Sequence, residues 1–456
     1  MATHLEYTPS SSPSGVQQTI SFWVKRSELG TDQCILEARQ NGTNLSNIKF
    51  NTDDRIHIYS ENGGTTNVYV RPTRQFRDVN AWYHFVFSID TSQGTAADRI
   101  KIYVNGVQET VMTTSTYPSS SYDNFWFGIA QKQVIGRDNG GSGSEDFQGI
   151  LSHFHYARGN VYQASTFGST DSTTGEWKIN TSPTVTYGAT GYFILKDGNS
   201  VTDQSPNTNN FTVGSGTLTK TEDCPSNVFC TINPLSNKIA FSLANGNTTL
   251  NDNGSDDNDN GLAGTMGVNS GKYYWEMKKG SGSGGVHAVI TDDVDIRAGN
   301  RATSSPDSQL WGFQSNGTGS PLVSYIAGTF NSTGNALQGW GANDIVGFAL
   351  DMDNGKLYVS INGVFKGLDN NTSDPANATN PAITGIPTGG KFILPYFEKR
   401  SGDSPETICN FGNGYFGTTA VSSNSGNGYS ASGSLGIFQY QPPSGYTALC
   451  TKGLNE

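Results

Sequence analysis

The chain is poor in charge and in long apolar runs. Only 15% of its 456 residues are charged, against about 25% in typical soluble proteins. The net charge is −11, and no cluster of Lys and Arg occurs. Nucleic acid is therefore not expected as a partner, because its phosphates are bound by clustered basic residues. We also expect no membrane insertion, because no apolar run reaches about 18 residues.

Signal-peptide and disulfide signatures are missing as well. The N-terminal stretch MATHLEYTPSSSPSG is polar and lacks the apolar core of a signal peptide. The cysteines are odd in number and widely spread, which does not fit a disulfide framework. We predict reduced thiols, with one bridge near the C-terminus as the alternative. The cysteines are Cys34, Cys224, Cys230, Cys409 and Cys450.

The sequence consists mainly of short apolar segments separated by Gly, Asn, Ser and Thr. There are 56 glycines, and this composition is typical of many short strands joined by turns. The segment TISFWVKR (19–26) alternates with a period of two and places Ile20, Phe22 and Val24 on one face. The segment AWYHFVFSID (81–90) is more apolar, as expected for a strand buried on both faces.

The same hairpin pattern occurs once in each half of the chain. RIKIYVNGVQETV contains Asn105-Gly106, and DNGKLYVSINGVF contains Asn362-Gly363. Asn-Gly accepts the positive φ angles of a type I′ turn. We predict an all-β chain with two antiparallel β-sandwich (jelly-roll) domains in tandem. The predicted divisions are a sandwich at 1–195, a linker at 196–228, a second sandwich at 229–412 and a C-terminal tail at 413–456, which docks on its own domain or on another subunit.

Two sets of motifs carry family resemblances. In the first half, TISFWVKRSELG, AWYHFVFSIDTSQ, DRIKIYVNGVQ and FQGILSHFHYARG follow one another. This order resembles the concanavalin A-like, laminin G-like jelly roll over residues 1–195. In the second half, SGKYYWEMKKG and VGFALDMDNGKLYVSINGV resemble a SPRY-type β-sandwich over residues 229–412.

The layout of the whole chain is similar to virion proteins of tailed bacteriophages. The segments involved are FGSTDSTTGEW, NVFCTINPL, ICNFG and PPSGYTALCTKGL. This resemblance implies a protein made in the host cytoplasm and displayed on the virion surface, in a fibre or capsid appendage. It implies other virion proteins as partners, a homo-oligomer such as a trimer, and a host-surface glycan as ligand. The alternatives are a purely architectural decoration or connector protein and a polysaccharide depolymerase.

Catalytic patterns are weak, so we predict no enzymatic activity. Glycoside hydrolysis needs two carboxylates flanking the bond, and no E-x-D-x-x-E pattern occurs. Asp351 and Asp353 lie two residues apart beside a turn, where we expect them to cap backbone amides. His153 and His155 share a strand face that we expect to be solvated, although two imidazoles at this spacing also suit a metal. His84 lies in an apolar strand and is expected to be a hydrogen-bonded core residue.

Two acidic loops are candidates for calcium, and no other cofactor is required. NDNGSDDNDNGLAG (251–264) fits the opening of a calcium loop with Asp256 and Asp259, but Gly267 stands where the closing Glu should be. The second loop, IGRDNGGSGSEDF (135–147), offers carboxylates at the rim of the first sandwich. These are Asp138, Glu145 and Asp146.

Three tryptophans are candidates for ligand binding, because exposed aromatic rings stack on sugar faces. Trp126 and Trp340 lie near predicted loops, and Trp311 lies in QLWGF, where its environment is ambiguous. The alternative for all three is packing that anchors a loop. The remaining tryptophans that we place inside strong strands, and hence in the core, are Trp23, Trp82 and Trp275.

Overall fold

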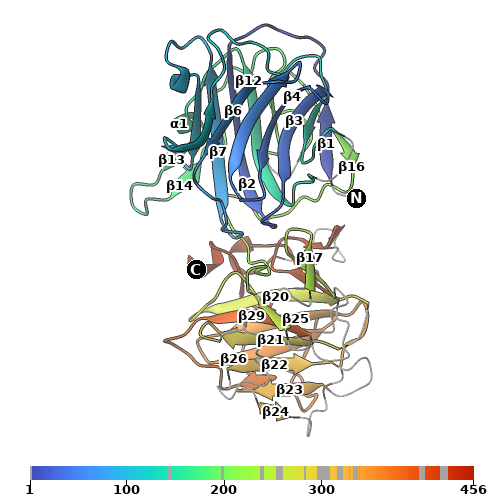
Figure 1. Cartoon of the computed structure of the whole chain (residues 1–456). Coiled ribbons are helices and arrows are strands. Elements are labelled where there is room, and N and C mark those ends of the chain that lie inside the picture. Colours follow the sequence, from blue (N-terminus) through green and yellow to red (C-terminus); the bar gives the residue numbers. More distant parts are fainter. Residues whose placement is uncertain are drawn as a thin grey trace. The chain divides into compact units, whose positions relative to one another are not determined.

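The computed structural model divides the chain into two compact units (Figure 1). Unit 1 comprises residues 1–220 and 224–226, and unit 2 comprises 221–223 and 227–456. Each unit is described on its own. The described residues are 3–140, 145–196, 200–236, 241–252, 260–281, 284–294, 309–315, 322–327, 329–331, 337, 339–399, 406–421 and 430–455.

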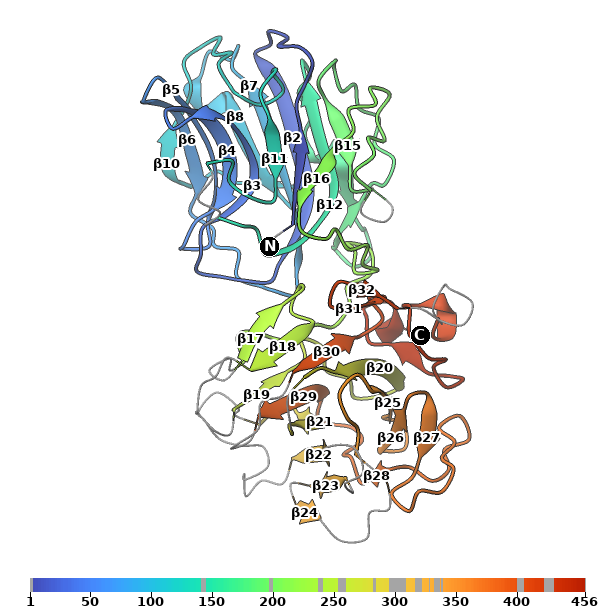
Figure 2. The same cartoon turned by 90° about the vertical axis from the view of Figure 1, so that its right-hand side faces the viewer.

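Unit 1 contains two antiparallel sheets. The larger has the order β10-β6-β5-β4-β3-β11-β1-β16, and Figure 2 shows several of these strands side by side. Its strands are Met112–Thr116, Thr65–Pro72, Ile56–Asn62, Asn44–Phe50, Gln33–Asn41, Gln133–Ile135, His4–Tyr7 and Thr212–Ser215. The smaller sheet has the order β15-β12-β2-β7-β8-β9. Its strands are Tyr192–Ile194, Gly149–Arg158, Gln17–Arg26, Trp82–Asp90, Ile100–Val104 and Val107–Gln108.

The core of unit 1 follows the period of two. Ile20, Phe22 and Val24 of β2 are fully buried in it, as predicted. On β7, Phe85 and Phe87 face the same core. Alternate side chains of both strands lie on the opposite face of the smaller sheet, as expected from the pleat.

That opposite face of the smaller sheet is covered by the chain that follows β12. The cover contains helix α1 (Ala164–Phe167) and the short antiparallel pair β13 (Gly168–Thr170) and β14 (Trp177–Ile179). Val86 of β7 is packed with residues of this cover. The prediction that strand 81–90 is buried on both faces is therefore confirmed.

The predicted linker at 196–228 is wrong for most of its length. Residues up to 220 belong to unit 1, because β16 pairs with the edge of β1. Phe211 is buried in the core of this unit. Asp203 holds the loop together by accepting hydrogen bonds from the backbone of Phe193, Ser205 and Asn209.

Unit 2 also contains two main sheets. One has the path β17-β18-β30-β20-β25-β26-β27, with β28 paired to β26 and β33 paired to β20. Its strands are Phe241–Ala244, Thr249–Asp252, Thr407–Asn410, Lys272–Lys279, Ile345–Asp351, Lys356–Ile361, Val364–Lys366, Ile383–Thr384 and Thr447–Ala448. The other has the order β19-β29-β21-β22-β23-β24. Its strands are Asn260–Ala263, Ile393–Lys399, Val286–Thr291, Leu310–Gln314, Val323–Ile326 and Thr329–Asn331.

The chain is nearly all-β and its sheets are antiparallel, as predicted, with one exception. The pair β20 and β33 is parallel. The remaining short elements are η1 (Ala96–Asp98), β31 (Tyr415–Phe416), β32 (Thr419–Ala420), η2 (Ser432–Ser434) and η3 (Gly453–Asn455). None of the described helices is long and apolar enough to cross a membrane.

The C-terminal tail docks on its own unit, which confirms one of the two predicted options. Strand β33 extends the sheet at β20, and Phe438 packs edge-on against Tyr274 of that strand, with ring centroids 5.0 Å apart. Tyr446 is fully buried in the same contact. The tail and the outer face of this sheet thus form a second small core, which comprises Phe229, Tyr274, Ala349, Tyr358, Ala431, Phe438, Tyr446, Ala448 and Cys450.

The two Asn-Gly hairpins are built alike. The φ angles are 46° and 82° at Asn105-Gly106, and 50° and 81° at Asn362-Gly363, as a type I′ turn requires. Each asparagine side chain accepts a backbone N–H from the neighbouring strand, at 2.7 Å in unit 1 and 2.9 Å in unit 2. The prediction of two equivalent hairpins is confirmed. All five cysteines are free in the structure, and their reduced state stays a prediction.

Candidate functional site

The predicted tryptophan sites do not come together. Trp311 and Trp340 are 3% and 0% exposed and lie in the core of unit 2, so neither presents a ring face to a ligand. Their prediction as binding residues is wrong. Trp126 is partly buried against the core of unit 1, and its Nε1–H donates to the Glu61 carbonyl at 3.2 Å. This ring therefore anchors its loop.

The rim carboxylates expected to bind calcium lie beside basic groups. Glu145 pairs with Lys49 at 2.9 Å, and Asp146 pairs with Arg137 at 3.2 Å. Asp138 is buried. Its carboxylate and the Arg39 guanidinium lie close together, because both border the same small space beside Gly140. Within the described residues, no group of three His, Cys, Asp or Glu side chains is placed to hold a metal. Asp256 and Asp259 lie outside the described residues.

The histidine strand face is buried rather than solvated, so that expectation is wrong. His153 and His155 are 8% and 2% exposed. The cover lies over His155, whose ring contacts Phe167, and the His153 ring contacts Phe193 of β15. His155 Nδ1 contacts the hydroxyl of Tyr187 at 2.9 Å. His84 is buried and hydrogen-bonded, as predicted, with Trp177 Nε1–H donating to its Nδ1 at 3.0 Å. Burial lowers the pKa of His84 to about 3, so the ring is neutral at ordinary pH.

Of the two acids of the second hairpin, Asp351 caps its own turn, as predicted, whereas Asp353 caps the backbone of a distant segment at Gly271. Asp351 accepts hydrogen bonds from the backbone and the side-chain amide of Asn354, at 3.1 and 2.8 Å. Asp353 accepts the Gly271 N–H at 2.8 Å. These bonds occupy the carboxylates in backbone capping.

The structure does gather polar and aromatic side chains on the outer face of the larger sheet of unit 1. Directly opposed residues on neighbouring strands share a face. Tyr69 on β6 opposes Tyr59 on β5, and Tyr59 opposes Asn47 on β4. Ile58 and Val70, one residue away on the same strands, point into the core. One cross-strand row thus comprises Thr116, Tyr69, Tyr59, Asn47, Glu37, Val134, Glu6 and Thr212.

We call the part of this face on β4, β5 and β6 the tyrosine face. The loop after β11 covers the next part, because Asn139 N–H donates to Glu37 there and Glu37 is fully buried. The rings of Tyr59 and Tyr69 are half-buried and meet edge to face, with centroids 5.8 Å apart. The tyrosine face comprises Asn47, Lys49, His57, Tyr59, Glu61, Tyr69 and Arg71.

Neighbouring side chains fix the two tyrosine rings. The Tyr59 hydroxyl donates to Glu61 at 2.7 Å. His57 lies edge-on to Tyr69, with centroids 5.1 Å apart, and its two nitrogens contact the amide oxygens of Asn51 and Asn47 at 2.7 and 3.0 Å. Burial lowers the pKa of His57 to about 3, so this support carries no charge near neutral pH.

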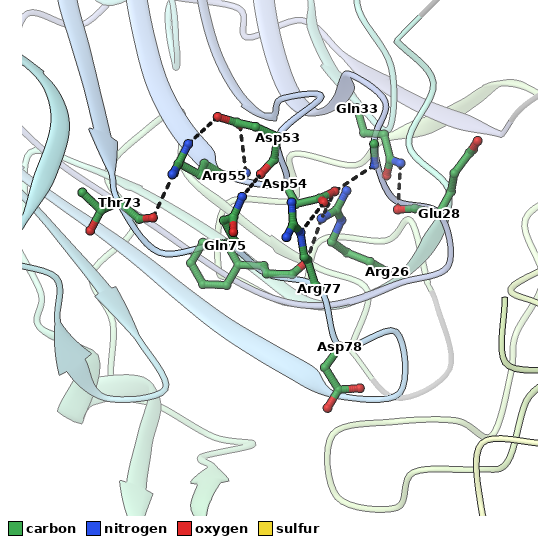
Figure 3. A network of polar contacts seen from close by, with 12 residues as sticks. Arg26, Glu28, Gln33, Asp53, Asp54, Arg55, Thr73, Gln75, Arg77 and Asp78 are labelled. Carbon is green, nitrogen blue, oxygen red and sulfur yellow. Dashed lines mark hydrogen bonds and ion pairs between the residues drawn. The ribbon is translucent and has the colours of Figure 1, made fainter. Parts of the chain in front are cut away.

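An arginine network borders the tyrosine face at the turn between β4 and β5 (Figure 3). Asp53 in this turn pairs with Arg55 at 2.6 Å and with Arg71 of the face. Arg71 is thereby held in place by a carboxylate outside the face. Lys49 is held in the same way by Glu145. The two basic groups of the tyrosine face are thus paired with carboxylates outside it. The rings of Tyr59 and Tyr69 stay partly exposed.

The second aspartate of this turn holds a buried arginine. Arg26 is fully buried, and its Nη1 donates to Asp54 at 3.1 Å and to the Phe76 carbonyl at 2.8 Å. Its guanidinium also lies over the Phe50 ring, 4.3 Å from the centroid. Arg77 donates to the other oxygen of Asp54 at 2.9 Å, so that the carboxylate lies between two guanidinium groups (Figure 3). Burial acts to raise the pKa of Asp54, but the Gly30 N–H, which donates to it at 2.9 Å, and the two arginines together lower it.

Sequence reasoning missed the tyrosine face, although a signal for it exists. In RIHIYSEN, Ile56 and Ile58 alternate with His57 and Tyr59. In TNVYVRP the apolar residues alternate in the same way with Tyr69 and Arg71. Aromatic residues at the outward positions of neighbouring strands indicate an open aromatic face. A search restricted to tryptophan instead selects residues of the core, such as Trp311 and Trp340.

Comparison with known proteins bears on the first half of the chain. Residues 3–164 match the sequence model of the Concanavalin A-like lectin/glucanases superfamily, Laminin_G_3. Unit 1 therefore contains a concanavalin A-like, laminin G-like jelly roll. This superfamily description includes both lectins and glucanases. No curated protein sequence matches the chain.

Three solved structures illustrate the partial similarity to known folds. The PSpry domain of TRIM65 has a TM-score of 0.28 at 17% identity, over 40% of this chain and 88% of that one. The SPRY domain of human HERC1 has a TM-score of 0.28 at 14% identity, over 39% and 96%. A heptameric SAP-like pentraxin from Limulus polyphemus has a TM-score of 0.29 at 15% identity, over 43% and 89%. Similarities at this level do not bear on function.

Proposed function

We propose that the protein is a non-enzymatic glycan-binding protein whose ligand site is the tyrosine face of unit 1. The observation that carries this proposal is the opposed pair of half-buried rings, Tyr59 and Tyr69, on an open sheet face. Sugar rings stack on aromatic faces, and nearby amides and carboxylates bond their hydroxyls. Asn47 and Glu61 stand beside the tyrosines on the same face.

The acids near the site support binding without hydrolysis. A glycosidase keeps two carboxylates free on either side of the scissile bond. Here Glu61 accepts the Tyr59 hydroxyl, and Asp53 lies between two arginines. The competing hypothesis of a polysaccharide depolymerase predicts release of reducing ends from a glycan incubated with the protein. We expect no release above a buffer control.

We also propose that this binding takes place on a virus particle, because the sequence resembles virion proteins of tailed phages. The chain would then be displayed on the particle surface and attached to other virion proteins. Antibody labelling of intact particles tests it, with labelled fibres or capsids as the expected result. A purely architectural role predicts instead that the tyrosine face is covered by a neighbouring virion protein.

The ligand site is tested by binding of glycans to the full chain. An array of neutral and acidic bacterial and algal glycans is probed with the wild type and with Tyr59→Ala and Tyr69→Ala. We expect each alanine variant to weaken binding about tenfold, which corresponds to about 1.4 kcal/mol. Tyr59→Phe keeps the ring and is the matched control, with affinity close to that of the wild type.

Three outcomes would contradict the proposed site. The first is an array without signal for the wild type. The second is unchanged binding by both alanine variants, which would place the ligand elsewhere. The third is equal loss by Tyr59→Phe and Tyr59→Ala, which would assign the effect to the hydroxyl and its bond to Glu61 instead of the ring. Circular dichroism of each variant verifies that the sheets are intact.

A further inference from the structure

Two buried histidines lie at the contact between the smaller sheet of unit 1 and its cover. The cover spans residues 160–190 and places α1, β13 and β14 beside β7 (Figure 1). His84 of β7 and His155 of β12 are 1% and 2% exposed. Phe167 of the cover contacts both imidazole rings, with centroids 6.3 and 5.0 Å away. The proposed ligand site lies on the other sheet and uses neither histidine.

Trp177 of the cover donates a hydrogen bond to His84. Its indole Nε1–H lies 3.0 Å from Nδ1 of the imidazole. An indole nitrogen only donates, so Nδ1 is the acceptor and carries no proton. In the neutral imidazole the proton is therefore on Nε2, which contacts the Ser21 hydroxyl at 2.9 Å. The contact with Trp177 thus fixes the tautomer of His84.

A second proton enters His84 only at Nδ1, the atom that accepts from Trp177. An imidazolium carries an N–H group on both nitrogens. Two donors would then face each other across the contact between the sheet and the cover. Protonation of His84 and its hydrogen bond with Trp177 therefore exclude each other.

The surroundings of the two histidines oppose a positive charge. Burial lowers the pKa of both, and His153 lowers it further in each. Lys196 acts in the same direction on His155. The titratable and charged groups that this face of the sheet and the cover bring near the pair are Lys25, Lys101, Tyr103, His153, Tyr162, Tyr187 and Lys196.

The acids of this region are engaged elsewhere or exposed. Asp98 pairs with Lys101 at 3.2 Å. In the cover, Asp171 pairs with Lys178 at 2.7 Å, and Glu176 is exposed. Asp203 acts on Tyr187, whose pKa is raised by burial and by this carboxylate. A charged His84 would therefore be surrounded mainly by aromatic rings and basic groups.

We propose that His84 and Trp177 form an acid-sensitive latch, in which protonation of His84 releases Trp177 and opens the middle of the cover. Both ends of the cover are tied to the sheet by other bonds. The Tyr162 N–H donates to Thr19 Oγ1 at 2.8 Å, and the Arg158 N–H donates to the Tyr187 carbonyl at 2.9 Å. Residues 163–186, which lie between these ends, are the part that opens.

Apolar contacts keep the latch closed when His84 is neutral. Val86 and Tyr103 of the sheet pack with Ala164 and Phe167 of the cover. Opening exposes these side chains to water, at a cost that grows with the apolar area uncovered. The cover is therefore closed near neutral pH and opens where protonation outweighs this cost.

The pH range follows from the two states of His84. Burial lowers its pKa to about 3 in the closed cover, and contact with water returns it toward 6.5. Because the pKa is lower in the closed state, closure is most favoured above about pH 6.5 and is weakened as the pH falls toward 3. This one proton raises the opening equilibrium about 70-fold between pH 7 and pH 4.5.

Hydrogen exchange of the full chain at pH 7 and pH 4.5 tests the latch. After correction for intrinsic exchange, peptides from residues 163–186 should lose about 70-fold in protection in acid. Peptides from β2, the strand beside β7, should lose much less. Constant protection of the cover overturns the proposal. An equal loss in β2 also overturns it, because the whole unit would then be unfolding.

Two variants separate His84 from the other buried histidines. His84→Asn keeps an oxygen that accepts the Trp177 N–H but takes up no proton, so its cover should lose less than about tenfold in protection. His57→Asn is the matched control, because burial lowers the pKa of His57 to about 3 as well, but on the larger sheet. It should retain the full loss in the cover. An undiminished loss in a folded His84→Asn protein overturns the proposal.

Nuclear magnetic resonance of the wild type decides the question if His84→Asn does not fold. The ring nitrogens of His84 and the indole N–H of Trp177 are followed from pH 7 to pH 4. We expect the indole N–H to lose its protection from exchange over the same pH range in which Nδ1 gains its proton. A protonated His84 beside a protected Trp177 indole would overturn the latch.

Discussion

Glu276 of unit 2 offers a pH-dependent test of how the C-terminal tail is held. This side chain is fully buried on β20 beneath the tail. Its carboxylate accepts the backbone N–H groups of Gln439 and Tyr440, both at 2.8 Å. The Tyr274 hydroxyl and the Asn410 amide donate to it as well, at 3.1 and 3.3 Å. One buried carboxylate thus connects the sheet to the tail.

Burial raises the pKa of Glu276 to about 7, although these hydrogen bonds oppose the shift. When the tail opens, water reaches the carboxyl group and its pKa returns toward the ordinary value of 4.5. Because the pKa is higher in the docked state, docking is most favoured below pH 4.5 and is weakened as the pH rises through 7. At about 1.4 kcal/mol per pH unit, docking loses about 2.5 kcal/mol between pH 5 and pH 8.

Hydrogen exchange of the full chain measures this difference at the tail itself. Protection factors for peptides that cover residues 437–448 report the opening equilibrium after correction for intrinsic exchange. A loss of about 2.5 kcal/mol corresponds to roughly a 70-fold fall in protection from pH 5 to pH 8. Glu276→Gln cannot ionise, so its protection should vary little over this range.

Either of two results would refute the reasoning. Protection that is constant or increases with pH in the wild type would mean that the four donors outweigh burial and keep Glu276 charged. The same fall in Glu276→Gln would mean that another group causes it. Peptides from β25, which lies on the side of β20 away from the tail strand, serve as the internal control, since their protection should vary less.

Two further predictions concern the stability of unit 1. Asp54→Asn should lower the free energy of unfolding by about 3–5 kcal/mol in urea denaturation, because it leaves the charge of fully buried Arg26 without its partner; a change below about 1 kcal/mol would contradict this. Gly106→Ala should destabilise more than Gly30→Ala in thermal denaturation, because both have positive φ but only the Cβ at 106 would clash with a ring, that of Trp177. Equal costs would show that the ring moves freely.

The sequence predicted strands and hairpins well because both depend on local chemistry. Alternation in TISFWVKR places Ile20 and Phe22 in the core whatever the partner strand is. An Asn-Gly pair such as Asn105-Gly106 selects its turn through its own φ angles. Side-chain burial in unit 2 was harder to predict from the sequence. Trp311, for example, lies on a strand that is buried on both faces and so shows no alternation of polar and apolar residues.

Domain boundaries and the binding face depend on contacts between distant segments. The stretch 196–220 is as polar as a linker. Its attachment to unit 1 depends on contacts with distant residues, such as the burial of Phe211, the hydrogen bond from the Phe193 backbone to Asp203 and the pairing of β16 with β1. The tyrosine face likewise requires the register of β5 against β6, which sets Tyr59 opposite Tyr69. A shift of one residue would turn one of these rings into the core. The alternation within each strand therefore sets which side chains face outward, but the opposition of the two rings also depends on the partner strand.

The hairpin that occurs twice explains why one sheet face of unit 1 is closed by the unit's own chain and the other is not. In unit 1, Trp177 of the cover packs on Gly106, and in unit 2, Tyr440 of the tail packs on Gly363, where an added Cβ would lie 2.6 Å from that ring. Each hairpin glycine therefore seats an aromatic side chain from the segment that closes the outer face of its own sheet. The smaller sheet of unit 1 is closed in this way by the unit's own chain. The larger sheet has no such hairpin among the described residues, and the tyrosine face lies on it.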